Sequence, residues 1–474
     1  MEGIERNKGN IIRDKFLKAM LTKMVSEKRV PLLIFLVILI VFCTWYLKYP
    51  FIHSPKVNII LITVDSLRPD HLGCYGYKRN TSPNIDKVAQ KSILFTQAIA
   101  QGSKTPLSLS SLHTSTYPRT HGVYREGFKI NPSLPTLAEI LKKNGYVTAA
   151  IVSCVKYIQG LERGFDYFID NGNTPADWVT QEAIFWLDKN RNNKSFLWIH
   201  YFDPHGPYKS PTPYNRMFKE MMGNKKLPIS NDLYSGFLSI PLYVAEDNIT
   251  DVDYYISQYD GEIRFVDEQI GVLLGKLKEL NLYKNSILII TADHGEAMGE
   301  HDHYFEHWSV YDEIIKIPLL FRWEKIIPLT NTINNQVQCI DIAPTILDIL
   351  YIHKPKTMQG MSLLPLILNK KKHPSMVAFS ENARPSDWIR ECIRTNEWKL
   401  IYTKQKNTEI FELFDLGFDK MEKNDVYKMK EKEFRFLRKL LQQWRQRIPE
   451  TKPQQCDNLT EETKSLLKNL GYMQ

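Results

Sequence analysis

The sequence predicts an α/β fold, in which a large, mostly parallel sheet is sandwiched by helices and is followed by a smaller C-terminal α+β subdomain. Short apolar runs alternate with amphipathic helical patterns along most of the chain. Three of these runs, Asn58–Val64, Phe196–Tyr201 and Ser286–Ala292, end just before clusters of Asp, His and Glu. Because open α/β sheets bind ligands beyond the carboxyl ends of their strands, we expect the three clusters to meet in one crevice.

Composition narrows the classes of protein to consider. The 474 residues suffice for one large domain and a smaller one, and 43% hydrophobic with 24% charged residues is ordinary for a folded protein. The net charge of +9 is spread along the chain without a basic block containing aromatic residues, so we expect no nucleic-acid partner. The six cysteines lie far apart, which favours neither a zinc knuckle nor a small disulfide scaffold.

The start of the chain predicts one transmembrane helix. Residues 1–29 form a basic segment, residues 30–49 an apolar anchor long enough to cross a bilayer core of ~30 Å, and residues 50–56 a tether. By the positive-inside rule the basic segment stays in the cytoplasm and the rest is exported to a periplasmic, extracellular or lumenal space. A cleaved signal peptide is the alternative, but the bulky residues Val41–Cys43 and the long first segment favour an uncleaved anchor.

The catalytic body is expected at residues 57–370 and the C-terminal subdomain at residues 371–474. Residues 209–250 are rich in Pro, Asn and Met without a clear period, so we expect an insertion that faces the substrate. The predicted strands of the body are Val57–Val64, Val147–Val152, Phe196–Tyr201, Ile287–Ile290 and Pro318–Phe321, and its helices include Leu134–Asn144 and Gln269–Leu280. The subdomain is expected to contain strands at Met376–Phe379 and Trp398–Tyr402 and helices at Glu431–Arg447 and Glu461–Leu470.

The strongest local signal for chemistry is Asp293-His294-Gly295-Glu296. A carboxylate and an imidazole side by side at a strand end can both reach one cation, and glycine permits the tight turn. Asp65 would add a second carboxylate from the first strand. The alternative is an Asp that caps a helix beside an incidental His. It is weakened by the further histidines nearby, His301, His303 and His307.

Thr105 and His205 are the candidates for attacking or binding an anionic ester. Thr105 as N-cap and Pro106 as N1 predict a helix over Pro106–Thr114, and plain capping is the alternative reading. A helix N-terminus also favours negative charge, so a Thr105 hydroxyl ionised beside a cation could attack a phosphate or sulfate ester. His205, in a Pro/Gly turn after a strand, is either an ordinary loop histidine or a ligand of the anionic group.

Several motifs together resemble the sulfatase family of the alkaline phosphatase superfamily. The likeness runs from Val57 to the C-terminus and implies an alkaline-phosphatase-like fold and metal-dependent cleavage of esters. The motifs that carry it are Asn58–Asp65, Leu72–Gly76, Thr81–Asp86, Leu112–Val123, Asp293–Glu296, Tyr311–Glu313, Gly360–Pro365, Glu412–Asp415 and Leu470–Tyr472.

The sequence departs from the family pattern at the site itself. Thr105 stands where the resemblance places the Cys or Ser that becomes formylglycine, and Leu109 stands at the arginine position. Ser66 replaces the second Asp of an Asp-Asp pair, His294 replaces the Asn of an Asp-Asn pair, and His307 stands where many members have lysine. A mixed carboxylate–imidazole site favours Mn²⁺ or Zn²⁺, with Ca²⁺ as the alternative.

The sequence therefore predicts a hydrolase of sulfate or phosphate esters on a glycan, lipid or small molecule. The predicted ligands of one divalent cation are Asp65, Thr105, Asp293 and His294. Thr105 is the expected nucleophile, and His205 and His307 are expected to hold the anionic group or protonate the leaving oxygen. Two alternatives remain, a transferase of phosphoethanolamine or glycerol phosphate and an inactive, membrane-tethered binding module.

Overall fold

The computed structural model describes residues 35–40, 57–155, 157–219, 225–232, 235–324, 331–368, 377–384, 388–456, 461 and 464–465. The chain forms two compact units, Met1–Lys56 and Val57–Gln474. In the first unit, residues 35–40 are helical and exposed. Over the described residues, no helix has the length and apolar character needed to span a membrane, and most of the predicted anchor at residues 30–49 lies outside them.

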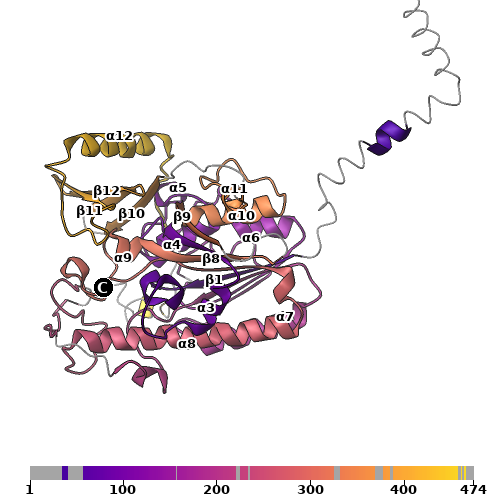
Figure 1. Ribbon diagram of the computed structural model, residues 1–474, viewed down its shortest axis with the longest axis horizontal. Helices are drawn as coiled ribbons and strands as arrows, with labels where there is room; N and C mark the ends of the chain where they lie inside the picture. Colours follow the sequence, from indigo (N-terminus) through magenta and orange to yellow (C-terminus); the bar gives the residue numbers. More distant parts are fainter. Residues whose placement is uncertain are drawn as a thin grey trace, which may run out of the picture. The chain divides into compact units, whose positions relative to one another are not determined.

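A mixed, mostly parallel sheet of eight strands forms the centre of the unit Val57–Gln474 (Figure 1). Among its described strands only β8 runs antiparallel to its neighbours, so the strand predicted at Pro318–Phe321 is present but reversed. In spatial order the strands are β5 (Tyr167–Asp170), β4 (Val147–Val152), β6 (Ser195–Tyr201), β1 (Asn58–Val64), β7 (Ser286–Ala292), β8 (Lys316–Arg322), β2 (Ile93–Ile99) and β9 (Asn331–Gln338).

The three strands that precede the polar clusters are neighbours in the centre of the sheet. β6, β1 and β7 lie side by side, and every residue in them is buried, which explains their predominantly apolar sequences. Val64 is in register with Tyr201 on one side and with Ala292 on the other. The three strands therefore end at the same level, and the predicted convergence of their carboxyl ends is confirmed.

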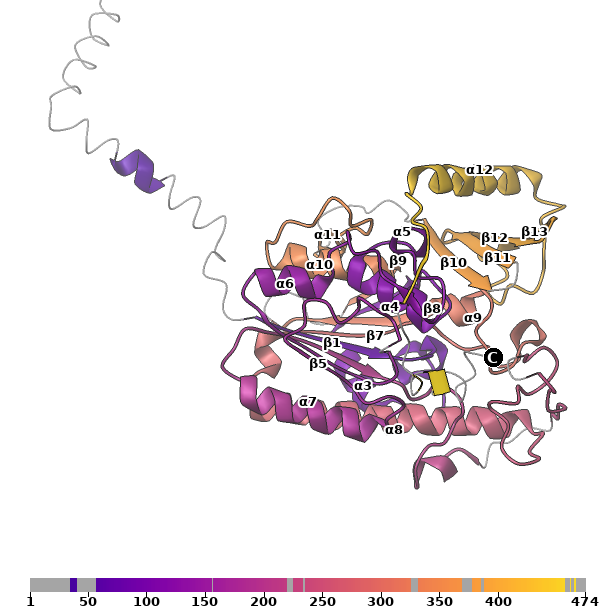
Figure 2. The ribbon, with the colours of Figure 1, turned by 180° about the vertical axis from the view of Figure 1, so that it is seen from behind.

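Helices cover both faces of the sheet, with α3 (Pro83–Ala89), α7 (Ala176–Asn190) and α8 (Val252–Glu279) on one face and α4 (Thr105–Thr114), α6 (Leu137–Lys143) and α10 (Ile342–Ile349) on the other (Figure 2). α6 begins later than predicted because Thr136 and Glu139 form a capping box. α8 begins far before the predicted Gln269, with Asp251 as its N-cap. Its first half buries polar residues such as Asp260 and Glu262, which interrupt the apolar period.

The C-terminal subdomain is a four-stranded antiparallel sheet covered by one helix (Figure 1). Its strands follow in the order β10 (Ala378–Arg384), β11 (Trp388–Arg394), β12 (Trp398–Gln405) and β13 (Thr408–Asp415), and the helix is α12 (Glu431–Arg447). β11 and β13 were not predicted, whereas the helix at Glu431–Arg447 is confirmed. Most of the helix predicted at Glu461–Leu470, and the predicted boundary at residue 370, lie outside the described residues.

The remaining elements are short. They are α5 (Pro118–His121), β3 (Phe128–Lys129) paired with β14 (Gln454–Gln455), α9 (Asp312–Ile315) and α11 (Leu364–Ile367), together with several single turns of 3-10 helix.

Candidate active site

Three buried groups at the ends of β1 and β7 converge as a metal site would require. One ligand atom from each of Asp65, Asp293 and His294 lies within 4.8 Å of the other two. His294 Nε2 is 3.6 Å from Asp65 Oδ1 and 3.4 Å from Asp293 Oδ2. These separations exceed a hydrogen bond and leave room for a cation between the atoms.

The surrounding contacts hold the three groups in orientations that suit a cation. His294 Nδ1 lies 2.8 Å from the Gly295 carbonyl oxygen and must donate to it, so Nε2 presents its lone pair to the carboxylates. Ser66 donates from its backbone N–H to Asp293 Oδ1 and from its hydroxyl to Asp65 Oδ1. Asp293 Oδ2 is buried and accepts no hydrogen bond from the described residues. A divalent cation would satisfy this oxygen, so the donor set fits a metal.

The two carboxylates have unequal electrostatic surroundings. Burial, together with the nearby charge of Asp65, raises the pKa of Asp293. Burial also opposes ionisation of Asp65, but the nearby imidazoles of His200, His205 and His294 lower the pKa of Asp65 to about 2. Asp65 is thus the group of the pair that the protein itself holds as an anion.

Thr105 joins the same cluster from the N-terminus of α4. Its hydroxyl oxygen lies 3.2 Å from Asp65 Oδ2 and 3.3 Å from His294 Nε2. The helix begins at Thr105 itself, so Lys104 occupies the capping position that the sequence assigned to Thr105. Gly102 permits this placement, because a Cβ there would come 2.3 Å from the Cβ of Leu107. The four predicted metal ligands therefore lie together.

His205 and His307 lie beside the cluster. The His307 ring centroid is 4.7 Å from that of His294 and 5.5 Å from that of His205. Burial lowers the pKa of both His205 and His307, so both rings are neutral near pH 7 and offer a lone pair to a proton. His205 Nδ1 lies 2.7 Å from the Gly206 carbonyl oxygen, which fixes the orientation of the ring.

Other residues of the predicted clusters lie elsewhere. His301 pairs with Glu313 and stacks on Tyr311, and His303 pairs with Glu306. Burial raises the pKa of Asp203 to about 7, and the backbone of Ala176 at the start of α7 is one of its hydrogen-bond partners. Because His301 and His303 pair with glutamates, the local density of histidines overstated the number of candidate metal ligands.

Sequence reasoning missed two titratable neighbours of the cluster, and the first is His200. His200 projects from β6, with Nε2 3.7 Å from Asp65 Oδ2 and Nδ1 2.8 Å from the hydroxyl of Thr63. It is completely buried in a run of apolar residues. A titratable residue in an otherwise apolar central strand was the available signal.

The second is Lys104, which precedes Thr105 and is 2% exposed. Its ammonium nitrogen lies 3.3 Å from the ring centroid of Trp308 and 3.8 Å from Glu126 Oε1. Its positive charge also helps to lower the pKa of His307. Lys104 thus brings a positive charge to the N-terminus of α4, and a lysine directly before the candidate nucleophile was the available signal.

The C-terminal subdomain brings a buried amide to the same side of α4. Gly102 forms a parallel bridge with Glu381 of β10, so residues 103 and 382 follow side by side. Both amide atoms of Asn382 and the hydroxyl of Ser103 are buried without a hydrogen-bond partner among the described residues. Arg390, opposite Asn382 on β11, donates to the carbonyl oxygen of Trp308. Lys104 and Arg390 therefore both contact Trp308, and Asn382 lies opposite Arg390 on the neighbouring strand.

The described parts of the predicted insertion at residues 209–250 pack against the segment that carries the histidines. Phe237 forms an antiparallel bridge with His303, and the Tyr243 hydroxyl donates to the carbonyl oxygen of Phe305. A Cβ at Gly236 would come 1.9 Å from the Tyr304 carbonyl oxygen, so the backbones approach very closely.

Comparison with known proteins identifies the family. The profile of the sulfatase family matches residues 57–352, and the profile described as "N-sulphoglucosamine sulphohydrolase, C-terminal" matches residues 299–450. The N-acetylglucosamine-6-O-sulfatase of Bacteroides thetaiotaomicron is 25% identical over an alignment that covers 87% of this chain and 89% of that protein.

Solved structures share the fold. A protein solved in complex with D-glucosamine-2-N,6-O-disulfate superposes with a TM-score of 0.71 and 21% identity, covering 83% of this chain and 99% of the other. The phosphonate monoester hydrolase from Silicibacter pomeroyi superposes with a TM-score of 0.70 and 18% identity, covering 86% of this chain and 98% of the other. Together with the profile match over most of the chain, the fold and the buried cluster lead to one assignment: the chain belongs to the sulfatase family and is a sulfuric or phosphoric ester hydrolase of that family.

Proposed function

We propose that this hydrolase cleaves its ester by direct attack of Thr105 at one divalent cation held by Asp65, Asp293 and His294. The observation that carries the proposal is the position of the Thr105 hydroxyl oxygen, which lies 3.2 Å from Asp65 Oδ2 and 3.3 Å from His294 Nε2. A hydroxyl in that position is itself a ligand of a cation bound there. When bound, the cation would stabilise the alkoxide of Thr105 and the charge on the ester oxygens.

The mixed donor set supports Mn²⁺ or Zn²⁺ as the cation. Two carboxylates, one imidazole nitrogen and one hydroxyl form a smaller and softer set than the six to eight oxygens that Ca²⁺ takes. Ca²⁺ is the alternative, and metal analysis of the purified protein decides between them.

The protein groups around Thr105 are suited to an anionic ester. An ester held beside Thr105 would lie at the N-terminus of α4, where free backbone N–H groups and the positive end of the helix dipole favour negative charge. Lys104 adds a full positive charge within the same turn. His205 and His307, neutral when buried, would accept the proton of Thr105 or hold an ester oxygen. The product of the first step would be a phospho- or sulfo-threonine.

We propose a sugar as the alcohol part of the substrate. The Bacteroides thetaiotaomicron relative is named for a sulfated N-acetylglucosamine, and another relative was solved with a glucosamine disulfate. In this chain the buried amide of Asn382 and the hydroxyl of Ser103 lie beside Thr105 without protein partners among the described residues. Hydroxyl groups of a pyranose ring would supply the missing donors and acceptors.

The second candidate is transfer of a phosphorus ester, such as phosphoethanolamine or glycerol phosphate, to an acceptor alcohol. The position of Thr105 favours this transfer reaction, because an ionised threonine can form a phospho-threonine. The acceptor alcohol, instead of water, would then attack the phospho-threonine. The same covalent intermediate serves both candidates, and they differ only in the acceptor.

We also propose that residues 30–49 anchor the chain in a membrane, with the catalytic body exported. The apolar run and its basic N-terminal flank support this proposal. Protease digestion of intact cells that removes the catalytic body while leaving residues 1–29 intact would agree with it, and complete protection of the body would contradict it.

The decisive experiment compares Thr105→Ala and Thr105→Ser on a panel of aryl sulfates, phosphomonoesters and phosphodiesters. We expect Thr105→Ala to lose about 10³-fold or more in kcat for every ester that the wild type cleaves, as loss of a nucleophile does. Thr105→Ser keeps a hydroxyl in the same position and should retain measurable turnover. Mass spectrometry of the quenched reaction should show an adduct on Thr105, and its mass identifies the transferred group.

Two results would contradict the proposal. Full activity of Thr105→Ala would remove the nucleophile assignment. A wild-type protein that binds no metal and cleaves none of these esters would instead support the third reading, a binding module that has lost turnover.

A further inference from the structure

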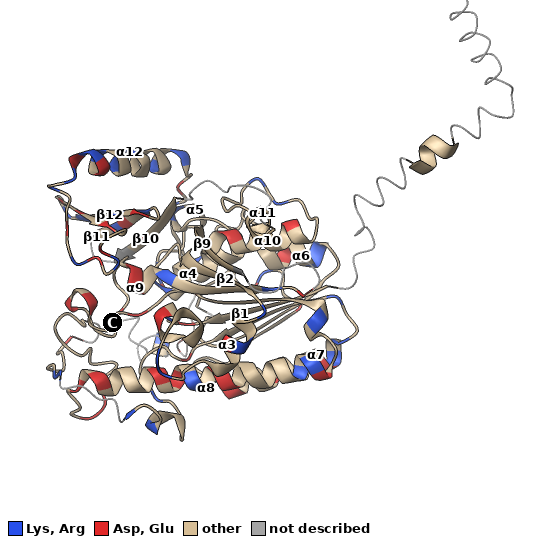
Figure 3. Cartoon of the chain, in the orientation of Figure 1, with Lys and Arg blue, Asp and Glu red and all other residues tan. Residues whose placement is uncertain are grey.

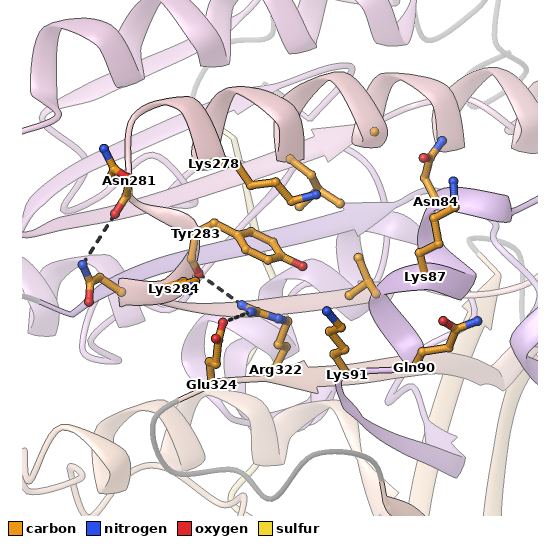
Figure 4. Close-up of a pocket in the computed structure, with 14 residues that line it drawn as sticks. Asn84, Lys87, Gln90, Lys91, Lys278, Asn281, Tyr283, Lys284, Arg322 and Glu324 are labelled. Carbon is orange, nitrogen blue, oxygen red and sulfur yellow. Dashed lines mark hydrogen bonds and ion pairs between the residues drawn. The ribbon is translucent and has the colours of Figure 1, made fainter.

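A cavity of about 1000 Å³ lies at the edge of the sheet opposite the active site. It is enclosed by α3, by the C-terminal part of α8 and by the end of β8 (Figure 4). Val88 and Leu274 form its apolar floor. Its volume stands at the upper end of the range for small-molecule sites, so it can hold a ligand larger than a single phosphate.

Positive charge dominates the lining of this cavity. Five cations face one carboxylate, that of Glu324; the cations are Lys87, Lys91, Lys278, Lys284 and Arg322. The four lysines are exposed, and none of them forms an ion pair with a described residue. Lys278 and Lys91 extend from opposite sides toward the space beside the Tyr283 ring (Figure 4).

One of the cations is buried and fixed in position. Arg322 is 2% exposed, its guanidinium lies 3.8 Å from the ring centroid of Tyr283, and it donates to the Tyr283 carbonyl oxygen and to Glu324. Its Nε–H has no acceptor among the described residues. Lys278 lies 5.2 Å from the same ring centroid. Two cations on one aromatic ring, one of them with a buried donor that no described residue accepts from, form a site suited to an anion.

The cavity lies at the edge where the strands begin. Asn285 in its lining directly precedes β7, and Arg322 is the last residue of the antiparallel β8. β1 also begins here, since Asn58 is in register with Ser286. Further basic residues stand at the C-terminal ends of α6 and α7, at the same edge (Figure 3). A seven-residue strand of about 23 Å separates this edge from Asp65 and Asp293.

The geometry points to this cavity as a second anion-binding site, for a ligand that carries two or more phosphate or sulfate groups. A single exposed ion pair contributes little to binding, so one anionic group would bind weakly. Several groups held at once by Lys91, Lys278 and Arg322 would add their contributions, because once one group is bound the next binds at a high effective concentration. The ligand is either a soluble polyanion or the phosphate headgroups of an anionic lipid surface, because both present closely spaced anions.

Protection of individual lysines from acetylation tests this inference on the full chain in mild detergent. The protein is treated with an acetylating reagent, with and without sucrose octasulfate, and each lysine is quantified by mass spectrometry. At a ligand concentration ten times its Kd we expect acetylation of Lys91 and Lys278 to slow about ten-fold, as mass action requires. Lys404 and Lys432, exposed in the C-terminal subdomain, serve as controls and should not change.

A second arm replaces the soluble polyanion with vesicles of phosphatidylglycerol or of phosphatidylcholine. Protection by phosphatidylglycerol alone assigns a lipid surface as the ligand, and protection by sucrose octasulfate alone assigns a soluble polyanion. The inference would be overturned if, in every arm, adding the ligand changed the acetylation rates of Lys91 and Lys278 no more than those of the two control lysines.

Variants separate this site from the active site. Lys91→Glu with Lys278→Glu should abolish protection of Lys284 while leaving ester cleavage unchanged, whereas the charge-matched pair Lys404→Glu with Lys432→Glu should preserve protection. Thr105→Ala should also preserve it, so the outcome is independent of the proposed nucleophile. Loss of protection in the Lys404/Lys432 pair would show that net charge alone, and no site, governs the effect.

Discussion

Replacing Lys104 by methionine separates what this buried cation does for stability from what it does for catalysis. Its ammonium lies 3.8 Å from Glu126, and the two side chains are 2% and 6% exposed. At an effective dielectric constant of about 20 this separation corresponds to about 4 kcal/mol, and the contact with the Trp308 ring adds about 1–2 kcal/mol. Because Lys104→Met leaves the carboxylate buried without its cation, we expect the free energy of unfolding to fall by about 3–5 kcal/mol.

The double variant Lys104→Met/Glu126→Gln removes both charges and should recover most of that loss. Catalysis should not recover with it. If Lys104 holds the anionic group, kcat/KM stays about 10²–10³-fold below the wild-type value in both variants, as when one electrostatic contact to the transition state is removed. Lys104→Arg keeps the charge and should fall between the wild type and Lys104→Met.

Two measurements decide the matter. Urea unfolding followed by tryptophan fluorescence gives the stability of each variant, and initial rates on the best ester of the panel give kcat and KM separately. A double variant that regains both stability and wild-type kcat/KM would refute the reasoning and leave Lys104 with a structural role only.

Three further predictions follow from single contacts. Asp293→Asn should lower the affinity for the divalent cation more than about ten-fold, because loss of even an outer-shell partner of a metal ligand lowers the affinity about 10–100-fold. Metal analysis after dialysis checks this prediction. The control is His301→Ala, which should keep its metal because the imidazole of His301 pairs with a glutamate away from the cluster. Asp312→Asn should lower the free energy of unfolding by about 3–5 kcal/mol, because Asp312 accepts hydrogen bonds from the buried Arg394 and Lys399, and urea titration would contradict this with a loss below 1 kcal/mol. Gly295→Ala should destabilise by about 1–3 kcal/mol because its Cβ would come 2.2 Å from a backbone carbonyl oxygen. Gly275→Ala, with open space around it in the C-terminal part of α8, should stabilise by about 0.5–1 kcal/mol. Equal melting temperatures of the two variants would contradict the account.

The catalytic sheet was predictable where burial made its strands apolar throughout. β1, β6 and β7 are buried on both faces, so each reads as a continuous apolar run with a clear end. β9 (Asn331–Gln338) and β13 (Thr408–Asp415) were missed because they carry many polar residues. The reversal of β8 was not readable either, since strand direction depends on chain connections and leaves no periodic signal.

The predicted ligands could be placed because each stands directly after a strand or at a helix start. Asp65, Thr105, Asp293 and His294 all meet this condition, and they lie together. The positions of His200 and Lys104 in the sequence do not indicate in the same way that they lie near the site. His200 occupies an interior strand position, and the importance of Lys104 depends on Glu126 and Trp308, which are distant in the sequence. Contacts of this kind arise from tertiary packing and could not be inferred from local pattern.

The packing of α4 explains how the side chain at residue 105, the proposed nucleophile, can differ while the fold stays the same. Every residue of this helix is buried, and Gly102 lets the preceding loop approach Leu107 so closely that only hydrogen fits between them. Residue 105 is therefore positioned by the packing of its neighbours, whichever side chain it carries. Threonine brings a hydroxyl to the same point beside Asp65 that another nucleophile would occupy. A change of chemistry at residue 105 needs no rearrangement of the sheet, so belonging to the family fixes the architecture of the site more firmly than it fixes the ester that the site cleaves.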